Sequence, residues 1–253
     1  MTGELPTIGL LGGMSPESSI EYERIINSEV RRALGGVHSA SLLIRSYDFA
    51  AIERLQVAGD WDAAGALLAS DAQRLEAAGA GLIVLCTNTM HRVADAIEAA
   101  IEVPFLHLAD ATAGAVVAAG IREVALLGTR YTMEGTFYRS RLERHGLHVI
   151  VPEEPDRSYV HDVIYGELVA GIIAPASRAG YVAVIERLVK RGAAGVVAGC
   201  TEIELLVGAD DVRVPYFATT TLHAQAAARW ALAGLEPHDG DRPAHTGGTD
   251  TGG

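Results

Sequence analysis

One pattern in this sequence occurs twice and constrains the fold more than any other feature. In each copy a first apolar stretch ends at small residues, a second ends in the pair Cys-Thr, and a third begins with Val-Pro. Similar spacing at three landmarks predicts an internal duplication, with two similar structural units in one chain. The matching positions lie 116, 114 and 111 residues apart, in the pairs Ile8 and Val124, Cys86 and Cys200, and Val103 and Val214.

Between these landmarks, short apolar runs alternate with segments of helical spacing. This order predicts an α/β fold with mainly parallel sheets. We expect two pseudo-symmetric α/β lobes with the site in the cleft between them, because such folds bind ligands at the carboxyl ends of strands. Lobe 1 is predicted at residues 1–118 and lobe 2 at residues 119–234, with a helix near 220–234 that packs back on lobe 1. Residues 235–253 have little apolar content, which predicts a disordered tail.

Charge and cysteine content narrow the class of protein. The formal net charge of -12 disfavours partners such as nucleic acid or an anionic membrane. No apolar run is long enough to span a bilayer, and the first residues do not have the pattern of a secretory signal. Two cysteines make no disulfide framework. We therefore predict a cytoplasmic protein that acts on a small molecule.

A glycine-rich turn follows the first apolar stretch. Gly12 and Gly13 allow a tight turn, and Ser15 is predicted to be the N-cap of a helix whose first residue is Pro16. The motif is neither a dinucleotide fingerprint nor a phosphate-binding loop, so it gives no support to nucleotide binding.

The two cysteines occupy matching contexts, because each ends an apolar strand and precedes a helical pattern. Pseudo-symmetry would then place Cys86 and Cys200 on opposite sides of one cleft. Two acid/base groups in that arrangement can remove a proton from one face of a carbon and deliver one to the other. A helix start can bring the thiol pKa from about 8.5 towards neutral, where general acid/base work is favoured. Neutral donors for a substrate carboxylate follow both cysteines, at Thr87, Asn88, Thr89 and Thr201.

Other interpretations of these residues exist. Each cysteine alone is typical of a small buried hydrophobe, and a disulfide between the two is disfavoured in a reducing compartment. A zinc site could recruit His91 and His223, but ligand-type spacing is lacking, so we expect no metal. The segment 46–49 is equally typical of a turn and of a ligand contact.

The chain resembles the cofactor-independent aspartate/glutamate racemase family. The resemblance rests on five motifs within residues 7–230: Gly-Gly-Met-Ser at 12–15, Ser-Tyr-Asp-Phe at 46–49, Cys-Thr-Asn-Thr-Met-His at 86–91, Leu-Gly-Thr-Arg-Tyr-Thr-Met at 127–133 and Gly-Cys-Thr-Glu-Ile at 199–203. It implies a homodimer that racemises amino acids with two cysteines, Cys86 and Cys200, and without pyridoxal phosphate or another cofactor. The residues expected at the substrate are Met14, Ser15, Gln56, Thr87, Asn88, Thr89, Thr132, Glu167, Thr201 and Glu202.

One position departs from the family pattern. Members that act on acidic amino acids are expected to have a lysine in the stretch that here reads Tyr-Gly-Glu-Leu-Val at 165–169. Glu167 would repel an acidic side chain, so we predict a neutral, basic or broad amino-acid substrate. Arg45 or Arg130 could still supply a cation for aspartate or glutamate.

Several alternatives stay open for the function. A strictly aspartate- or glutamate-specific racemase is one. A hydantoin racemase, a maleate isomerase and an arylmalonate decarboxylase are relatives with other chemistry, although the decarboxylase needs only one thiol. A non-catalytic amino-acid-binding protein belongs to a different class.

Overall fold

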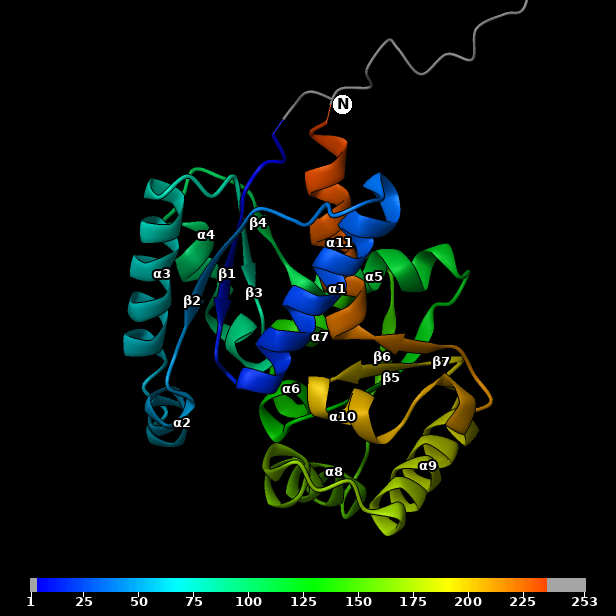
Figure 1. The fold of residues 1–253 in the computed structure, drawn as a ribbon. Coiled ribbons are helices and arrows are strands. Elements are labelled where there is room, and N and C mark those ends of the chain that lie inside the picture. The colour runs from blue at the N-terminus through cyan, green and yellow to red at the C-terminus, as the bar shows by residue number, and fades with distance from the viewer. Residues whose placement is uncertain (1–3, 236–253) are drawn as a thin grey trace, which may run out of the picture.

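The computed structural model describes residues 4–235 and consists of two lobes, each built on one four-stranded parallel sheet (Figure 1). The strand order is β2-β1-β3-β4 in the first sheet and β6-β5-β7-β8 in the second. The two orders are equivalent, which is the arrangement that an internal duplication predicts. The expected two-lobe α/β fold is therefore confirmed.

The first half of the chain contains these elements. Its strands are β1 (Ile8–Gly12), β2 (Leu42–Ser46), β3 (Leu82–Leu85) and β4 (Phe105–Leu106). Its helices are α1 (Pro16–Leu34), α2 (Phe49–Ala58), α3 (Trp61–Ala77), the 3-10 helix η1 (Thr89–Val93), α4 (Ala94–Glu98) and α5 (Leu108–Ala118).

The second half repeats the strand order with different helices. Its strands are β5 (Glu123–Gly128), β6 (His148–Ile150), β7 (Gly195–Gly199) and β8 (Tyr216–Ala218). Its helices are α6 (Arg130–Glu134), α7 (Thr136–Arg144), α8 (Asp156–Gly166), η2 (Leu168–Ala170), α9 (Pro175–Lys190), α10 (Thr201–Leu206), η3 (Ala209–Asp211) and α11 (Thr219–Ala233).

The glycine-rich turn after β1 forms as the sequence predicts. Ser15 caps α1, where its Oγ accepts a hydrogen bond from Ser18 N at 3.4 Å, and Pro16 is the first helical residue. Gly13 has φ +83°, and a Cβ at this position would collide with the backbone of Tyr47. The turn between β1 and α1 therefore requires glycine at this position.

Helical spacing in the sequence predicts helices over residues 134–145 and 158–171, and the structure differs from these bounds near glycines. The first prediction matches α7 closely, and a separate short helix, α6, ends just before Gly135, whose backbone is extended. The pattern over residues 158–171 overestimates α8, which ends at Gly166 and is followed by η2 up to Gly171 at φ +74°. Helices α6 and α8 therefore both end at or next to a glycine, which has a low helix propensity.

Two helices cross between the sheets. Helix α11 follows the second sheet but packs on the first, with Ala224, Ala227 and Ala228 in a core cluster with Ile8 and Val84. In the same way α5 follows the first sheet, and its residues belong to the core cluster of the second. The first of these contacts is the predicted return of the last helix to lobe 1. The predicted boundary between residues 118 and 119 stays a prediction. Helix α5, which lies before this boundary in the sequence, packs on the second sheet.

No helix of the described region combines the length and apolar character needed to cross a membrane. The predicted disordered tail lies outside the described residues from residue 236 onward.

Candidate active site

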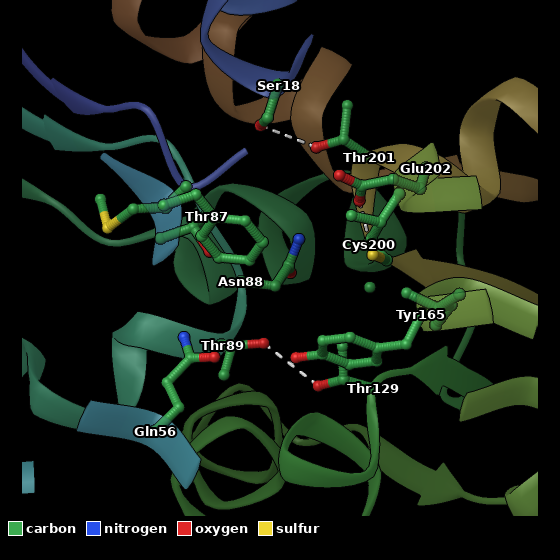
Figure 2. Close-up of a pocket in the computed structure, with 15 residues that line it drawn as sticks. Ser18, Gln56, Thr87, Asn88, Thr89, Thr129, Tyr165, Cys200, Thr201 and Glu202 are labelled. Atoms are coloured by element: carbon green, nitrogen blue, oxygen red, sulfur yellow. Dashed lines mark hydrogen bonds between the residues drawn. The ribbon is translucent and has the colours of Figure 1, made fainter. Parts of the chain in front are cut away.

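A small pocket lies between the two lobes, where the carboxyl ends of the central strands meet (Figure 2). The centre of a water molecule can occupy about 40 Å³ of it. The first sheet and its helices contribute Met14, Ser18, Phe49, Gln56, Thr87, Asn88 and Thr89. The second sheet and its helices contribute Thr129, Ile164, Tyr165, Val169, Gly199, Cys200, Thr201 and Glu202.

Polar side chains join the two lobes around this pocket. Ser18 Oγ lies 2.9 Å from Thr201 Oγ1, and Thr89 Oγ1 lies 3.1 Å from Thr129 Oγ1. Asn88 Nδ2 also donates to Thr219 Oγ1 at 3.1 Å. These bonds connect the two lobes beside the pocket, and the hydroxyl groups of Ser18, Thr89, Thr129 and Thr201 lie on its wall.

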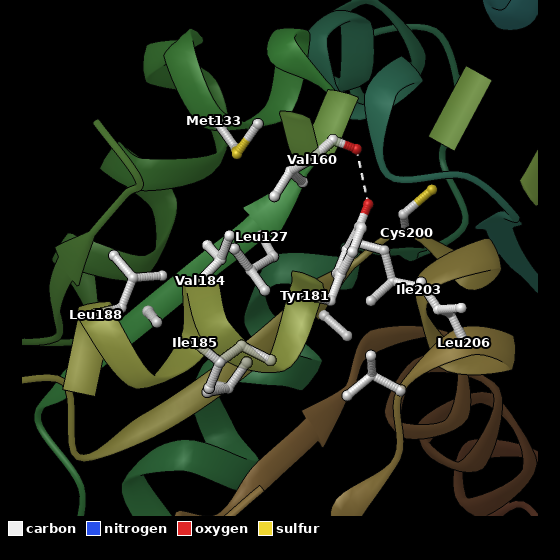
Figure 3. Packing of buried hydrophobic residues seen from close by; sticks show 14 of the residues in the cluster. Leu127, Met133, Val160, Tyr181, Val184, Ile185, Leu188, Cys200, Ile203 and Leu206 are labelled. Atoms are coloured by element: carbon white, nitrogen blue, oxygen red, sulfur yellow. Dashed lines mark hydrogen bonds between the residues drawn. The ribbon is translucent and has the colours of Figure 1, made fainter. Parts of the chain in front are cut away.

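Cys200 lies at the N-cap of α10 and shares a hydrogen-bonded chain with a carboxylate. Its Sγ donates to Glu202 Oε2 at 2.8 Å, and Ser15 Oγ donates to Glu202 Oε1 at 2.7 Å. Cys200 lies at the edge of a core cluster of the second lobe, and Figure 3 shows its sulfur directed away from the apolar side chains. The thiol therefore faces the pocket and has a proton acceptor within reach.

The ionisation of Cys200 differs from the sequence-based expectation. Burial and the adjacent Glu202 carboxylate raise the pKa of the Cys200 thiol well above its ordinary value. The expected lowering by a helix start is outweighed because the carboxylate and the loss of water both disfavour a thiolate. The resting group is a thiol whose proton points at Glu202.

The structure corrects the expected location of Cys86. Its side chain is fully buried in the core cluster of β1, β3, α1 and α11, with Sγ 4.0 Å from Val84 O, and it is not among the pocket-lining residues. Burial raises the pKa of the Cys86 thiol. The two facing thiols predicted from the sequence are not brought together.

Strand register explains the error. Leu11 of β1 pairs with Leu85 of β3, and its duplicate Leu127 of β5 pairs with Ala198 of β7. Leu85 and Ala198 are therefore equivalent positions of the two sheets. Both point into the core cluster on the corresponding face of their sheet.

The residue equivalent to Cys200 is therefore Thr87, 113 residues before it, and not Cys86. A shift of one residue along a strand turns the side chain to the opposite face. Cys86 accordingly points to α11, whereas Thr87 lines the pocket. Figure 2 shows Thr87 and Cys200 on opposite sides of the pocket, with Asn88 between them in this view.

Most other predicted substrate residues line the pocket, but three do not. Ser15 reaches it only through Glu202. Thr132 is fully buried, with its Oγ1 3.3 Å from Thr129 Oγ1. Glu167 accepts a hydrogen bond from Ser177 Oγ at 2.5 Å instead of facing the pocket. Those that do line it are Met14, Gln56, Thr87, Asn88, Thr89, Cys200, Thr201 and Glu202.

Some pocket residues were missed by the sequence analysis. Thr129 could have been found, because it is the duplicate of Gly13 at the end of the first strand of its sheet. Tyr165 and Val169 come from α8 and η2, in the stretch 165–169 where the sequence analysis considered only the charge of Glu167.

The pocket lining contains one carboxylate, Glu202, and neither lysine nor arginine. Arg45 is paired with Asp71 at 2.9 Å, and Arg130 donates to Ser158, so neither lines the pocket. Two buried amide oxygens in the lining, Gln56 Oε1 and Asn88 Oδ1, have no hydrogen-bond partner. Unpaired buried acceptors are costly, and a ligand that donates hydrogen bonds would satisfy them.

The rings of three buried histidines pack together, and one of them, His91, bonds to the carbonyl of the pocket residue Thr87. The ring centroid of His91 lies 4.6 Å from that of His107 and 5.8 Å from that of His223. Burial lowers the pKa of His223 to about 4 and that of His107 to about 3. Within residues 4–235 no three His, Cys, Asp or Glu side chains are placed to hold one metal ion.

Comparisons with known proteins agree with this architecture. The model of the family described as Asp/Glu/Hydantoin racemase matches residues 11–227. The crystal structure of a "putative Asp/Glu Racemase" from Yersinia pestis is 54% identical, covers 90% of this chain and 100% of its own, and has a TM-score of 0.86. An aspartate racemase homologue from Pyrococcus horikoshii is 32% identical over 90% of this chain and 100% of its own, with a TM-score of 0.79. The glutamate racemase of Aquifex pyrophilus, 15% identical over 88% of this chain and 83% of its own with a TM-score of 0.59, shares the fold.

Proposed function

Because the chain belongs to the Asp/Glu/hydantoin racemase family, we propose that it is a cofactor-independent isomerase that inverts the α-carbon of an amino acid. The observation that carries this proposal is the pair of equivalent strand ends at one pocket. Cys200 reaches the pocket from the second sheet and Thr87 from the first. An α-carbon held between them can lose a proton on one face, become a planar carbanion, and gain a proton on the opposite face.

The first step is removal of the Cα proton by Cys200. As the Cα–H bond breaks and a new S–H bond forms, the original thiol proton passes to Glu202 Oε2 over the 2.8 Å hydrogen bond. Ser15 stabilises the carboxylate before the transfer, because its hydroxyl donates to the other oxygen. The raised pKa of Cys200 fits this coupled transfer, since the sulfur never needs to carry a full negative charge in the resting state.

The second step is delivery of a proton from Thr87 Oγ1 to the opposite face of the carbanion. A hydroxyl donates a proton to a carbanion readily, but it is a much weaker base than a thiol with a carboxylate partner. The two faces are therefore unequal. Hydrogen exchange with solvent should be faster from the enantiomer whose Cα proton faces Cys200, and the cycle is reset when Thr87 and Glu202 exchange protons with water after product release.

We propose a neutral amino acid as the preferred substrate. Glu167 does not line the pocket, but the lining has no cation to pair with an acidic side chain and already holds the Glu202 carboxylate. The unpartnered oxygens of Gln56 and Asn88 support binding of a substrate ammonium and of a donor on the side chain.

The test is a panel of L-amino acids in heavy water, read by chiral chromatography and mass spectrometry. We expect D-enantiomer formation with deuterium at Cα, and kcat/KM for the best neutral amino acid at least about tenfold above that for aspartate or glutamate. Strict preference for the two acidic amino acids would contradict the substrate proposal. Absence of exchange with every amino acid that binds would favour a binding protein instead.

A second candidate function follows from the single thiol in the pocket. One-sided proton delivery to a carbanion is what a decarboxylase of the arylmalonate type requires, and the position of Cys86 removes the sequence argument against it. Incubation with a disubstituted malonate distinguishes the two functions. Release of carbon dioxide with no racemisation of any amino acid would replace the racemase proposal.

A prediction concerns the carboxylate that holds the Cys200 proton. Glu202→Gln should lower kcat for racemisation about 100-fold, because an amide oxygen cannot accept the thiol proton as a carboxylate does. Glu204→Gln is the matched control, since Glu204 accepts from Thr220 N and Thr221 Oγ1 and does not line the pocket. Equal losses in the two variants would show that Glu202 acts only through folding of α10.

Two further properties are proposed from the family and the composition. A homodimer is what the family resemblance implies, and sedimentation at equilibrium would test it. A reducing cytoplasmic location is supported by the two free cysteines, Cys86 and Cys200.

A further inference from the structure

The His91 side chain is bonded to main-chain atoms of two different segments. It lies in η1 and is buried, with Nδ1 2.7 Å from Thr87 O and Nε2 3.1 Å from Leu108 N. Thr87 lines the pocket, whereas Leu108 is the first residue of α5, which packs on the second sheet. One imidazole ring therefore connects the turn after β3 to α5, the helix of the first half of the chain that packs on the second sheet.

The tautomer of His91 follows from its partners. Leu108 N is a donor, so Nε2 must accept with its lone pair, and the ring proton lies on Nδ1. Nδ1–H then donates to Thr87 O. Burial, together with the adjacent rings of His107 and His223, lowers the pKa of His91, so the ring stays neutral and keeps both bonds.

Thr87 needs such a support because it lies just beyond the last residue of β3. It is outside the ladder that β3 forms with β1, so strand pairing does not fix its orientation. Its peptide N–H bonds back to Leu85 O at 2.9 Å, and its carbonyl is held by the His91 ring. Loss of the ring would free one side of this peptide, and small displacements of a reacting group reduce rates strongly.

We propose that His91 is a positioning residue, which holds the Thr87 peptide against α5 so that the Thr87 hydroxyl faces the substrate opposite Cys200. This inference rests on the proposed function of Thr87. His91 does not touch the substrate, and it acts through the bond to Thr87 O.

Two substitutions of His91 each remove one of its two hydrogen bonds and keep the other. In His91→Asn the amide nitrogen replaces Nδ1 and can still donate to Thr87 O, but the acceptor for Leu108 N is lost. In His91→Gln the amide oxygen replaces Nε2, and the donor to Thr87 is lost. His107→Asn is the matched control, because His107 packs against His91 but bonds only to Ala109 N in its own turn.

The readout is deuterium exchange at Cα, measured separately for the L- and D-enantiomer of the best substrate. We expect His91→Gln to lower exchange of the enantiomer that faces Thr87 about tenfold or more, and to leave exchange of the one that faces Cys200 within about twofold. His91→Asn and His107→Asn should keep the wild-type ratio of the two rates. A folded His91→Gln protein with both rates lowered equally, or a His107→Asn protein with the same imbalance, would overturn the proposal.

If His91→Gln does not fold, His91→Asn carries the test alone. It keeps the donor to Thr87 O, so its ratio of exchange rates must match that of the wild type even if its stability falls, and a changed ratio overturns the proposal. Failure of the proposed function is distinguishable. A wild-type protein that exchanges no amino-acid proton overturns both inferences, whereas normal wild-type exchange with a symmetric loss in the variants overturns only the role of His91.

Discussion

Replacing Cys200 with alanine should lower racemisation at least about 100-fold, whereas replacing Cys86 with alanine should leave kcat within a few-fold of the wild-type value. Cys200 faces the pocket and contacts Glu202, while Cys86 packs against α11 in a core cluster. Loss of the Cys86 sulfur removes only apolar packing, which costs about 1 kcal/mol of unfolding free energy. Steady-state rates of both variants with the best substrate, measured with circular dichroism as a check of folding, test this contrast.

Thr87 takes the role that the sequence assigned to Cys86, and its substitution provides a second test of the mechanism. Thr87→Val keeps the shape of the side chain but has no proton to deliver, so it should stop racemisation and leave exchange at the Cys200 face. Full activity of Thr87→Val, or loss of activity in a stably folded Cys86→Ala protein, would restore the two-thiol mechanism that the sequence suggested.

On acidification this protein should lose stability at a higher pH than protonation of its carboxylates alone would cause. His223 is fully buried and neutral, with one ring nitrogen 2.7 Å from Tyr22 OH and the other donating to Leu106 O at 2.8 Å. Its pKa is about 4 in the folded state, against an ordinary value of 6.5. The unfolded chain therefore binds a proton that the folded chain excludes. This contribution to stability is complete above pH about 6.5 and is lost as the pH falls towards 4, in total about 3 kcal/mol.

His91 and His107 act in the same direction, because their pKa values are lowered as well. Urea unfolding between pH 7 and pH 4.5 measures the effect as a steep fall in unfolding free energy. His223→Gln should flatten this dependence, even though it lowers stability at pH 7, and substitution of the exposed His38 should not change it. A slope that is identical in the wild type and His223→Gln would contradict the assignment.

Much of the fold follows from local sequence signals. The helix start at Ser15, the turn at Gly13 and the apolar strands could be predicted, because each of these features depends only on residues close in the sequence. The duplication followed from the repeated order of the strands. The register of the two central strands was not accessible in this way. The Cys-Thr pairs suggested that Cys86 matches Cys200, yet the sheets align Thr87 with Cys200, and only the pairing of β1 with β3 and of β5 with β7 shows it.

The rest of the site depends on contacts between distant segments. The Cys200 pKa was expected to fall because of the helix start, but the sequence does not show that Glu202 turns back onto the sulfur in a buried pocket. In the same way, Glu167 has the expected charge but a different partner, Ser177. Glu202 is the second residue of α10 and Glu167 follows the last residue of α8, and the partners of side chains at helix ends depend on tertiary packing.

The crossing of α5 and α11 has a consequence during synthesis on the ribosome. One face of the first sheet, with Ile8, Leu10 and Val84, is covered by alanines of α11 at residues 224–231. A nascent chain that has emerged only as far as the first four strands must therefore keep this face without its final cover until almost the whole polypeptide has been translated. Chaperones that shield apolar surface would be needed most in that interval, and completion of the last helix would end it.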